Sequence, residues 1–357
     1  MGEVANKKPY NETYENFRLS LKRFLIKIKF EKWKGWLYLS PCIILLLIFT
    51  VWPIFNTLRM AFWNEYGLMT EIGMENIRKE YMELTLKQTG TAIDPGNLYP
   101  YEFGIQNFIN VVDYGQFWQC MKNTMLLCVL TVPISTILAL VIAVCLNSIG
   151  PLSRFLQTIF FLPYVTNSIA IGMVFSAMFN IIGYNTSMPS YGIINNILGI
   201  FGMDPVNWMN NGSPYWANIV VLVVYIVWNA LPFKILILLG GLQSVNKQYY
   251  DAAKIDSTPK LRVFTKITVP LLSPMIVYVV ITGFIGGFKE YSSIVGIFGD
   301  DMQAPAGESL NTMVGYIYKQ LGQDHEGQAS AAALILFAII FVVTMINLYV
   351  SKKKTHF

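Results

Sequence analysis

Charged residues are scarce in this chain. Asp, Glu, Lys and Arg make up 13% of its 357 residues, while hydrophobic residues make up 54%. Soluble globular domains carry about 25% charged residues, because charged side chains cover much of their surface. The composition therefore excludes an ordinary soluble domain and indicates an integral membrane protein.

The signatures of several catalytic chemistries are missing. The sequence has no G-x-x-x-x-G-K-[ST] loop, so the chain is not expected to bind and hydrolyse ATP by itself. Its two histidines, His325 and His356, have no neighbouring cysteine that would complete a metal site. No Ser, His and acid set suggests an intramembrane hydrolase. We therefore expect a non-catalytic chain without a metal or cofactor of its own.

Cysteine is also rare, and no C-x-x-C motif occurs. The four cysteines, Cys42, Cys120, Cys128 and Cys145, lie within apolar runs. Free, buried thiols that act as small apolar side chains are therefore expected rather than disulfides.

Long apolar runs dominate the rest of the sequence. A helix needs about 20 apolar residues to cross a bilayer, and the runs lack the period-two alternation of barrel strands. The sequence therefore predicts an all-α membrane protein with six transmembrane helices. We place them near residues 36–61, 117–146, 155–181, 216–242, 268–294 and 329–349.

Lys and Arg are distributed unequally between the connecting segments. The N-terminal segment 1–35, Arg154, the 244–268 loop and the tail 351–357 hold 18 of them, whereas the other loops hold four against 14 acids. Basic residues favour the cytoplasmic side, so both termini should be cytoplasmic, flanking a permease domain at 36–350. The net charge of +5 is explained by this orientation, and nucleic acid is not expected as a partner.

The loop around "YYDAAKIDSTPKLRVFTKITVP" (residues 249–270) is polar and patterned. Residues 246–255 fit a short amphipathic helix that should stop before Pro259, and Thr258 would cap a second helix with Pro259 in its first turn. Such a helical pair could enter the groove of a soluble partner. The same pattern also suits an ordinary loop lying on lipid headgroups.

This loop resembles the EAA loop of ABC importer permeases, whose pattern is E-A-A-x-x-D-G-A followed by F-x-x-I-T-x-P-L-L. Here it reads DAAKIDST at 251–258 and FTKITVPLL at 264–272. The chain departs from the pattern where Asp251 replaces Glu and Ser257-Thr258 replace Gly-Ala. At that turn glycine would tolerate a positive φ more readily.

Further stretches, including "FLQTIFFLPYVTNSIAIGMVFSAMFN" and "VWNALPFKILILLGGLQSV", resemble the sugar-importing branch of these permeases, typified by the maltose permease subunit. The resemblance extends from about 102 to 349. It implies a bacterial cell-membrane subunit that works with a second permease subunit, two ATPase subunits that bind ATP and Mg, and an extracellular solute-binding protein. It also implies a coupling helix that docks on the ATPase, with candidate residues Tyr250, Asp251, Ala252, Ala253, Asp256 and Ser257.

Intramembrane charges mark candidate functional positions, because they are costly in lipid. Lys234, Lys289 and Glu290 are such charges, and a structural ion pair between them is an alternative explanation. The resemblance places the sugar site at Asn229, Phe233, Gly287 and Glu290. Phe233 could stack on a sugar ring while Asn229 and Glu290 bond its hydroxyls. Nearby, Gly283 and Gly286 would clear space for a ligand or for a neighbouring helix.

The outer segment 64–116 contains an insertion at about 69–100 that could contact the solute-binding protein or be a passive excursion. The main expectation is thus a carbohydrate ABC importer permease. An ion-coupled secondary sugar carrier is the alternative, although its usual internal repeats with charges in both halves are missing. A membrane scaffold or sensor without transport is a third possibility.

Overall fold

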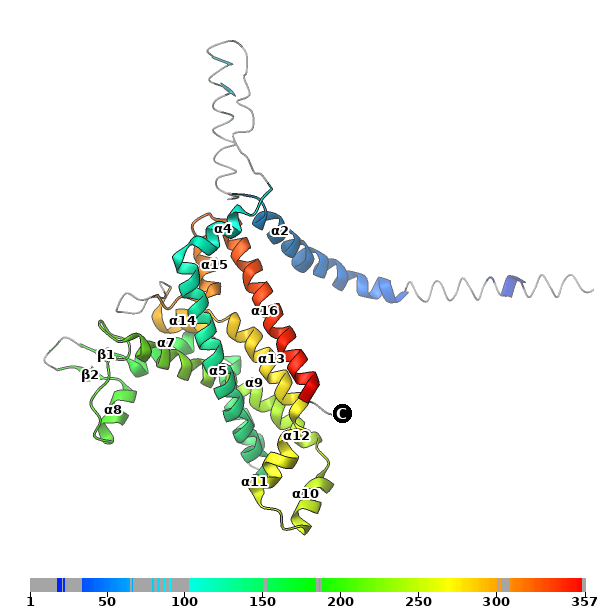
Figure 1. The fold of residues 1–357 in the computed structure, drawn as a ribbon, viewed down its shortest axis with the longest axis vertical. Helices are drawn as coiled ribbons and strands as arrows, with labels where there is room; N and C mark the ends of the chain where they lie inside the picture. Colours follow the sequence, from blue (N-terminus) through cyan, green and yellow to red (C-terminus); the bar gives the residue numbers. More distant parts are fainter. Residues whose placement is uncertain are drawn as a thin grey trace, which may run out of the picture. The chain divides into compact units, whose positions relative to one another are not determined.

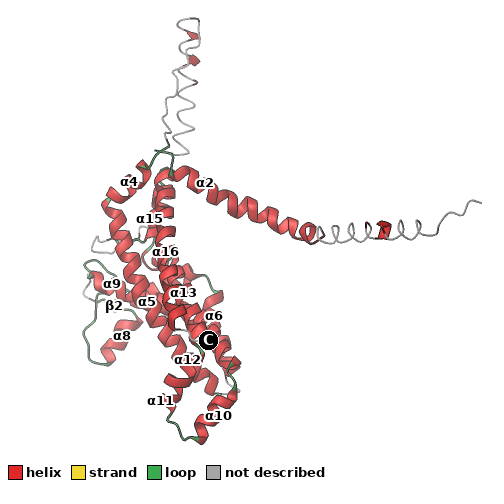
Figure 2. Cartoon of the chain, turned by 45° about the vertical axis from the view of Figure 1, so that its right-hand side comes forward, coloured by secondary structure: helices red, strands yellow, loops and turns green. Residues whose placement is uncertain are grey.

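The computed structural model describes residues 18–20, 22, 34–64, 66, 79, 82–83, 86–87, 90, 103–149, 153–183, 186, 188–300, 302 and 309–354. Most of these residues are helical, and the two strands among them, β1 (Ile181–Ile182) and β2 (Ser190–Tyr191), are very short (Figure 2). The chain divides into two compact units, residues 1–59 and 60–357. The predicted all-α membrane class is confirmed.

Four of the predicted spans are single long apolar helices. They are Lys34–Ala61, α5 (Gly115–Ser148), α9 (Tyr215–Ser244) and α16 (Glu326–Lys354). The other two predicted spans are bent helix pairs, and the total reaches six when each pair is taken as one span. The predicted insertion at about 69–100 lies almost wholly outside the described residues.

The predicted span at 155–181 is not one straight helix. It consists of α6 (Ser153–Val165) and α7 (Ser168–Phe179). The chain bends by 99° between the helical segments Phe155–Val165 and Ser168–Phe179. The apolar run gives no sign of this break, but Pro163 weakens the end of α6. Asn167 then caps α7, since its side chain accepts hydrogen bonds from the backbone N–H groups of Ile169 and Ala170.

The predicted span at 268–294 is also broken. It contains α12 (Val269–Leu271), α13 (Ser273–Phe288) and the start of α14 (Ser292–Phe298), and it is preceded by α11 (Lys260–Val263) and the π-helical turn η3 (Phe264–Thr268). The parts before and after Leu272 are bent by 69°. A second π-helical turn, η1 (Leu47–Val51), precedes α2 (Trp52–Ala61). Both π turns lie near a proline, Pro270 or Pro53, whose missing N–H disrupts regular α-helical bonding.

Within the unit of residues 60–357, α5 is the central helix. It packs against α9 along much of its length and also against α13, which in turn contacts α16. Figure 1 shows α4 (Gln106–Asp113) and α15 (Met313–Leu321) at one end of this bundle, and α10 (Lys247–Ile255) and α11 at the other. The short helix α8 (Ile193–Ile200) follows β2 beside the bundle.

Buried amides attach the connecting segments to the helices. Asn123 of α5 is fully buried and donates hydrogen bonds to the carbonyl oxygens of Ser309 and Asn311, at 2.8 and 2.9 Å. Its own carbonyl oxygen accepts from the Tyr215 hydroxyl at 2.6 Å. One side chain therefore joins α5, α9 and the segment before α15.

The four cysteines are free, as predicted, but their surroundings differ. Cys120 and Cys128 are buried within α5, whereas Cys42 and Cys145 are exposed on the described surface. The prediction of four buried thiols is therefore wrong for the latter two. An apolar run in a membrane protein does not distinguish a helix face that packs on protein from one that faces outward.

Candidate functional site

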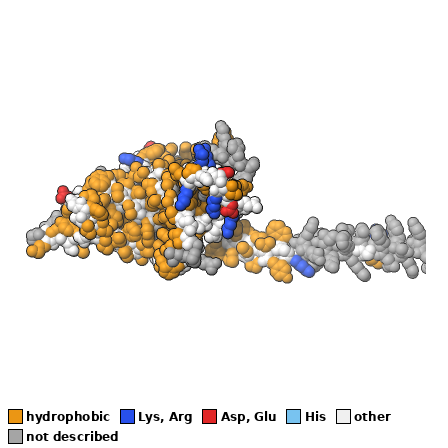
Figure 3. Space-filling view, turned by 90° about the horizontal axis from the view of Figure 1, so that it is seen from below, with side chains coloured by type: hydrophobic (Ala, Val, Ile, Leu, Met, Phe, Trp, Pro, Cys, Tyr) orange, Lys and Arg blue, Asp and Glu red, His pale blue; other side chains and the backbone are white. Residues whose placement is uncertain are grey.

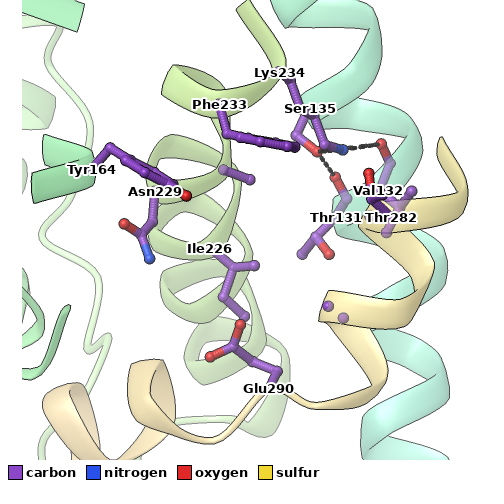
Figure 4. A pocket seen from close by; sticks show the side chains of 14 residues that line it. Thr131, Val132, Ser135, Tyr164, Ile226, Asn229, Phe233, Lys234, Thr282 and Glu290 are labelled. Atoms are coloured by element: carbon purple, nitrogen blue, oxygen red, sulfur yellow. Dashed lines mark hydrogen bonds between the residues drawn. The ribbon is translucent and has the colours of Figure 1, made fainter. Parts of the chain in front are cut away.

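A cavity of about 290 Å³ lies between α5, α6, α9 and α13, and all four residues of the predicted sugar site line it. These are Asn229, Phe233, Gly287 and Glu290 (Figure 4). The volume is close to the lower end of the range of about 300–1,000 Å³ that is typical of small-molecule sites. Positions that are 61 residues apart in the chain thus line the same cavity.

Two aromatic rings form one side of the cavity. Phe233 of α9 stacks with Tyr164 near the end of α6, with ring centroids 6.1 Å apart and an interplanar angle of 19°. Tyr164 is 53% exposed, so its ring has free surface next to the cavity. Such a pair offers flat apolar surface and a hydroxyl to the same ligand. The sequence argument missed Tyr164, because its span was expected to continue straight past this position.

Asn229 lies one turn before Phe233 on α9 and faces the start of α7. Its amide nitrogen is 3.4 Å from the hydroxyl oxygen of Ser168, to which it donates. The hydroxyl of Tyr225 in turn donates to the Ser168 carbonyl. The bend between α6 and α7 therefore brings a helix start against α9, where its polar groups orient the Asn229 amide.

Glu290 follows the end of α13 and precedes α14. One carboxylate oxygen accepts a hydrogen bond from the backbone N–H of Ser293 at 3.1 Å, so the side chain caps the N-terminus of α14. The Glu290 carbonyl accepts from the Thr312 hydroxyl at 2.7 Å. These contacts fix the carboxylate at the edge of the cavity, where Figure 4 shows it pointing toward Ile226.

The three glycines of α13 that line the cavity have different surroundings. A Cβ on Gly287 would be 2.8 Å from the Cys128 sulfur, and one on Gly283 would be 3.2 Å from the Lys234 nitrogen. These two glycines therefore allow close packing on α5 and α9. A Cβ on Gly286 would meet no atom within 4 Å, so Gly286 widens the cavity. Packing inside this chain thus accounts for Gly283 but leaves Gly286 unexplained.

Lys234 is only 4% exposed, yet it is part of the cavity lining. Its ammonium nitrogen donates to the Val132 carbonyl, the Ser135 hydroxyl and the Thr136 hydroxyl, at 3.2, 2.7 and 2.9 Å. All three acceptors belong to α5, and none is a carboxylate. Among the described residues, Lys234 therefore does not form the ion pair with Glu290 that was the alternative explanation. Lys289 is exposed and is not among the lining residues.

The sequence argument also missed the hydroxyl groups that α5 contributes to the cavity. Thr131 and Ser135 line it, one helical turn apart, together with Val132. The sequence does contain a pattern that could have identified them. Hydroxyl residues four positions apart lie on one face of a helix, and on an apolar helix they can accept hydrogen bonds from a lysine of a neighbouring helix. That pattern identifies its partner only after the packing of α5 on α9 is known.

The second candidate site is the segment formed by α10 and α11. The helix α10 begins after Asn246, whose side chain accepts a hydrogen bond from the Gln248 backbone N–H at 3.0 Å. The predicted helix and its end before Pro259 are confirmed. Thr258, however, does not cap α11. Pro259 occupies that position with extended backbone angles, and α11 begins one residue later than predicted.

Ser257 adopts a positive φ of 50°, the conformation expected of the glycine that it replaces. The turn is closed by bonds from the backbone N–H groups of Ser257 and Thr258 to the carbonyls of Lys254 and Ala253, at 3.0 and 2.9 Å. These are the bonds of a helix C-terminus that ends in a left-handed residue. The substitution of serine thus keeps the turn, at the cost of some backbone strain.

The six predicted coupling residues divide into two groups. Asp251, Ala252, Asp256 and Ser257 are exposed, whereas Ala253 is buried and Tyr250 is half-buried with its hydroxyl 3.4 Å from that of Thr268. Tyr250 therefore links α10 to Thr268, the residue that precedes α12.

The exposed face of this segment also carries apolar side chains, Ile255 at 84% and Leu261 at 74% exposure. The end-on view in Figure 3 shows Lys and Arg gathered in one part of a surface that is otherwise largely hydrophobic.

The comparisons with known proteins agree with this architecture. Residues 132–356 match the family described as binding-protein-dependent transport system inner membrane component. The lactose transport system permease protein LacF of Rhizobium radiobacter is 28% identical over 319 residues, which cover 88% of this chain and 91% of LacF. The arabinooligosaccharides transport system permease protein AraP of Bacillus subtilis is 28% identical over 324 residues, which cover 90% of this chain and 89% of AraP.

The fold is also similar to a chain in the crystal structure of a bacterial alginate ABC transporter in complex with an alginate pentasaccharide-bound periplasmic protein. The TM-score is 0.69 at 21% identity, over 93% of this chain and 98% of that one. The family match covers more than half of the chain. This multi-pass membrane protein therefore belongs to the family of binding-protein-dependent transport system inner membrane components.

Proposed function

We propose that this chain is a permease subunit of an ATP-driven ABC importer and that it translocates a carbohydrate delivered by an extracellular solute-binding protein. A second permease subunit and two ATPase subunits would complete the transporter. The chain itself would be non-catalytic, since ATP and Mg would be bound by the ATPase subunits. Both termini would face the cytoplasm of a bacterial cell.

The cavity between α5, α9 and α13 is the observation that carries this proposal. It combines a stacked aromatic pair with an amide, hydroxyls and a carboxylate, and this mixture suits the apolar faces and hydroxyl edges of a sugar. Two relatives of similar length, LacF and AraP, are named for transport of lactose and of arabinooligosaccharides. The substrate class inferred from the cavity agrees with those names.

The segment of α10 and α11 supports the coupling part of the proposal. Its exposed acids and apolar side chains, Asp251, Asp256, Ile255 and Leu261, lie together on a short helical pair at one end of the bundle (Figure 1). Such a surface fits a groove on a soluble protein. Tyr250 would transmit movement of that partner to Thr268 and α12, and through α12 to α13 at the cavity.

Uptake by the assembled transporter tests the proposal. The chain is purified from its native membranes in mild detergent with the subunits that remain bound, and it is reconstituted in vesicles with the co-encoded solute receptor. We expect uptake of a labelled neutral saccharide that requires ATP inside the vesicles. Uptake by the chain alone, driven by a proton or sodium gradient, would overturn the proposal in favour of a secondary carrier.

A further inference from the structure

Every donor of the Lys234 ammonium group is already used by α5. A lysine ammonium has three N–H bonds and no acceptor. In this structure Val132, Ser135 and Thr136 provide three acceptors between 2.7 and 3.2 Å from the nitrogen. The side chain thus borders the cavity with its charge directed into α5, as Figure 4 shows for the bond to Val132.

The hydroxyl protons of α5 confirm this direction of bonding. The Ser135 hydroxyl donates to the Thr131 carbonyl at 2.5 Å, and the Thr136 hydroxyl donates to the Val132 carbonyl at 2.6 Å. Each hydroxyl has one proton, which is therefore committed to its own helix, and only lone pairs remain for Lys234. The lysine must act as the donor, and no N–H is left for a ligand.

Glu290 is the opposite case. One of its oxygens accepts from the Ser293 N–H, and its other oxygen has no hydrogen-bond partner among the described residues. Lys234 and Glu290 are the two charged residues among those that line the cavity. The charged group of the cavity lining that keeps a free acceptor is therefore a carboxylate, which attracts hydroxyl donors and repels anions.

We propose that Glu290 is the specificity-determining charge of the cavity and that Lys234 is a structural cation sequestered by α5, so that this chain selects uncharged, hydroxyl-rich saccharides over uronates and sugar phosphates. The inference rests on the proposed function and deepens it. It also separates this chain's expected substrate from that of the structurally similar importer, whose substrate is the acidic polysaccharide alginate.

Binding to the detergent-purified membrane complex without its solute receptor tests this selectivity, because the receptor's own preference then makes no contribution. A panel of lactose, maltose and arabinobiose first identifies a neutral disaccharide that binds. The matched probe is the same disaccharide with its terminal hydroxymethyl group oxidised to a carboxylate. We expect titration calorimetry to show roughly tenfold or more weaker binding of the acid, the effect of a like charge near the ligand.

Variants assign the effect to individual residues. Glu290→Gln should bring the acid to within about threefold of the neutral sugar, since an amide neither repels nor requires charge. The matched control Asp300→Asn, which alters an exposed acid outside the cavity lining, should leave the preference unchanged. Lys234→Met should lower the melting temperature without weakening binding of the acid, whereas its control Lys289→Met should do neither.

The outcomes are distinguishable. Wild-type protein that binds the acid as tightly as the neutral sugar, and loses it in Lys234→Met, would make Lys234 an anion site and overturn the inference while leaving carbohydrate import intact. An unchanged preference in Glu290→Gln would also overturn it. Absence of binding to every sugar, neutral or acidic, would instead overturn the proposed function on which the inference rests.

Discussion

A contact between two glycines gives a sharp test of the architecture around the cavity. Gly172 of α7 and Gly296 of α14 are both buried, and a Cβ on Gly172 would be 2.8 Å from the Gly296 Cα. In the reverse direction, a Cβ on Gly296 would be 2.9 Å from the Ile169 carbonyl oxygen. The obstacles are backbone atoms, so neither helix can relieve the clash by rotating a side chain.

The expected cost follows from two opposing effects. Overpacking a well-packed interior costs about 1–3 kcal/mol, and a backbone obstacle places Gly172→Ala near the upper value. Replacing glycine by alanine inside a helix returns about 1 kcal/mol of helix propensity. We therefore expect Gly172→Ala to destabilise the protein by about 2 kcal/mol, equivalent to a fall of roughly 5 °C in melting temperature.

Gly240→Ala is the matched control, because Gly240 lies in α9, is exposed and would meet no atom within 4 Å of its Cβ. Only the propensity gain remains there, so this variant should be up to about 1 kcal/mol more stable than the wild type. Thermal unfolding in detergent, followed by tryptophan fluorescence, compares the two. Equal melting temperatures for both variants would show that α7 and α14 do not approach as described.

Three further predictions concern other parts of the chain. Asn123→Leu should lower the melting temperature in the same assay, since it removes the donor to the carbonyl oxygens of Ser309 and Asn311, at about 1–3 kcal/mol for each of these groups that stays unpaired; an unchanged value would contradict the described attachment. Ser257→Val should destabilise α10 by about 1 kcal/mol relative to Ser257→Gly, because a β-branched residue resists a positive φ, and protease cleavage at this turn should report the difference. Asp251→Arg should uncouple ATP hydrolysis from uptake without loss of membrane insertion, whereas Asp204→Arg, a control at an exposed acid between α8 and α9, should not; normal coupled uptake in Asp251→Arg would argue against docking through α10.

The sequence was sufficient for the spans that are straight. Long apolar runs predicted α5, α9 and α16 to within a few residues, because hydrophobic length is the quantity that the bilayer selects. The sequence did not predict the bends within the two broken helix pairs. The break between α6 and α7 interrupts no apolar run, and the cap at Asn167 is a local polar contact inside it. Hydrophobicity alone therefore locates the apolar segments of the chain, but not where one of them bends.

The cavity shows a similar division. Motif resemblance selected Asn229, Phe233, Gly287 and Glu290, and the structure brings all four to one cavity, although their contact with a substrate stays a prediction. Tyr164 and the hydroxyls of α5 were missed because they come from helices with no motif for the site. The role of Lys234 was open for the same reason. An ionisable residue within a membrane signals that a partner exists, and only the packing of helices identifies it.

The bond between Lys234 and α5 has a consequence for how the protein is made. A lysine near the centre of a membrane helix raises the free energy of insertion by about 2.5–3.5 kcal/mol. Because α5 precedes α9 in the chain, the oxygens that receive this charge enter the bilayer before the lysine leaves the ribosome. The helix synthesised earlier thus offers acceptors that offset part of this cost when α9 enters the bilayer, so damage to the α5 hydroxyls would affect the assembly of the helix bundle as well as the cavity.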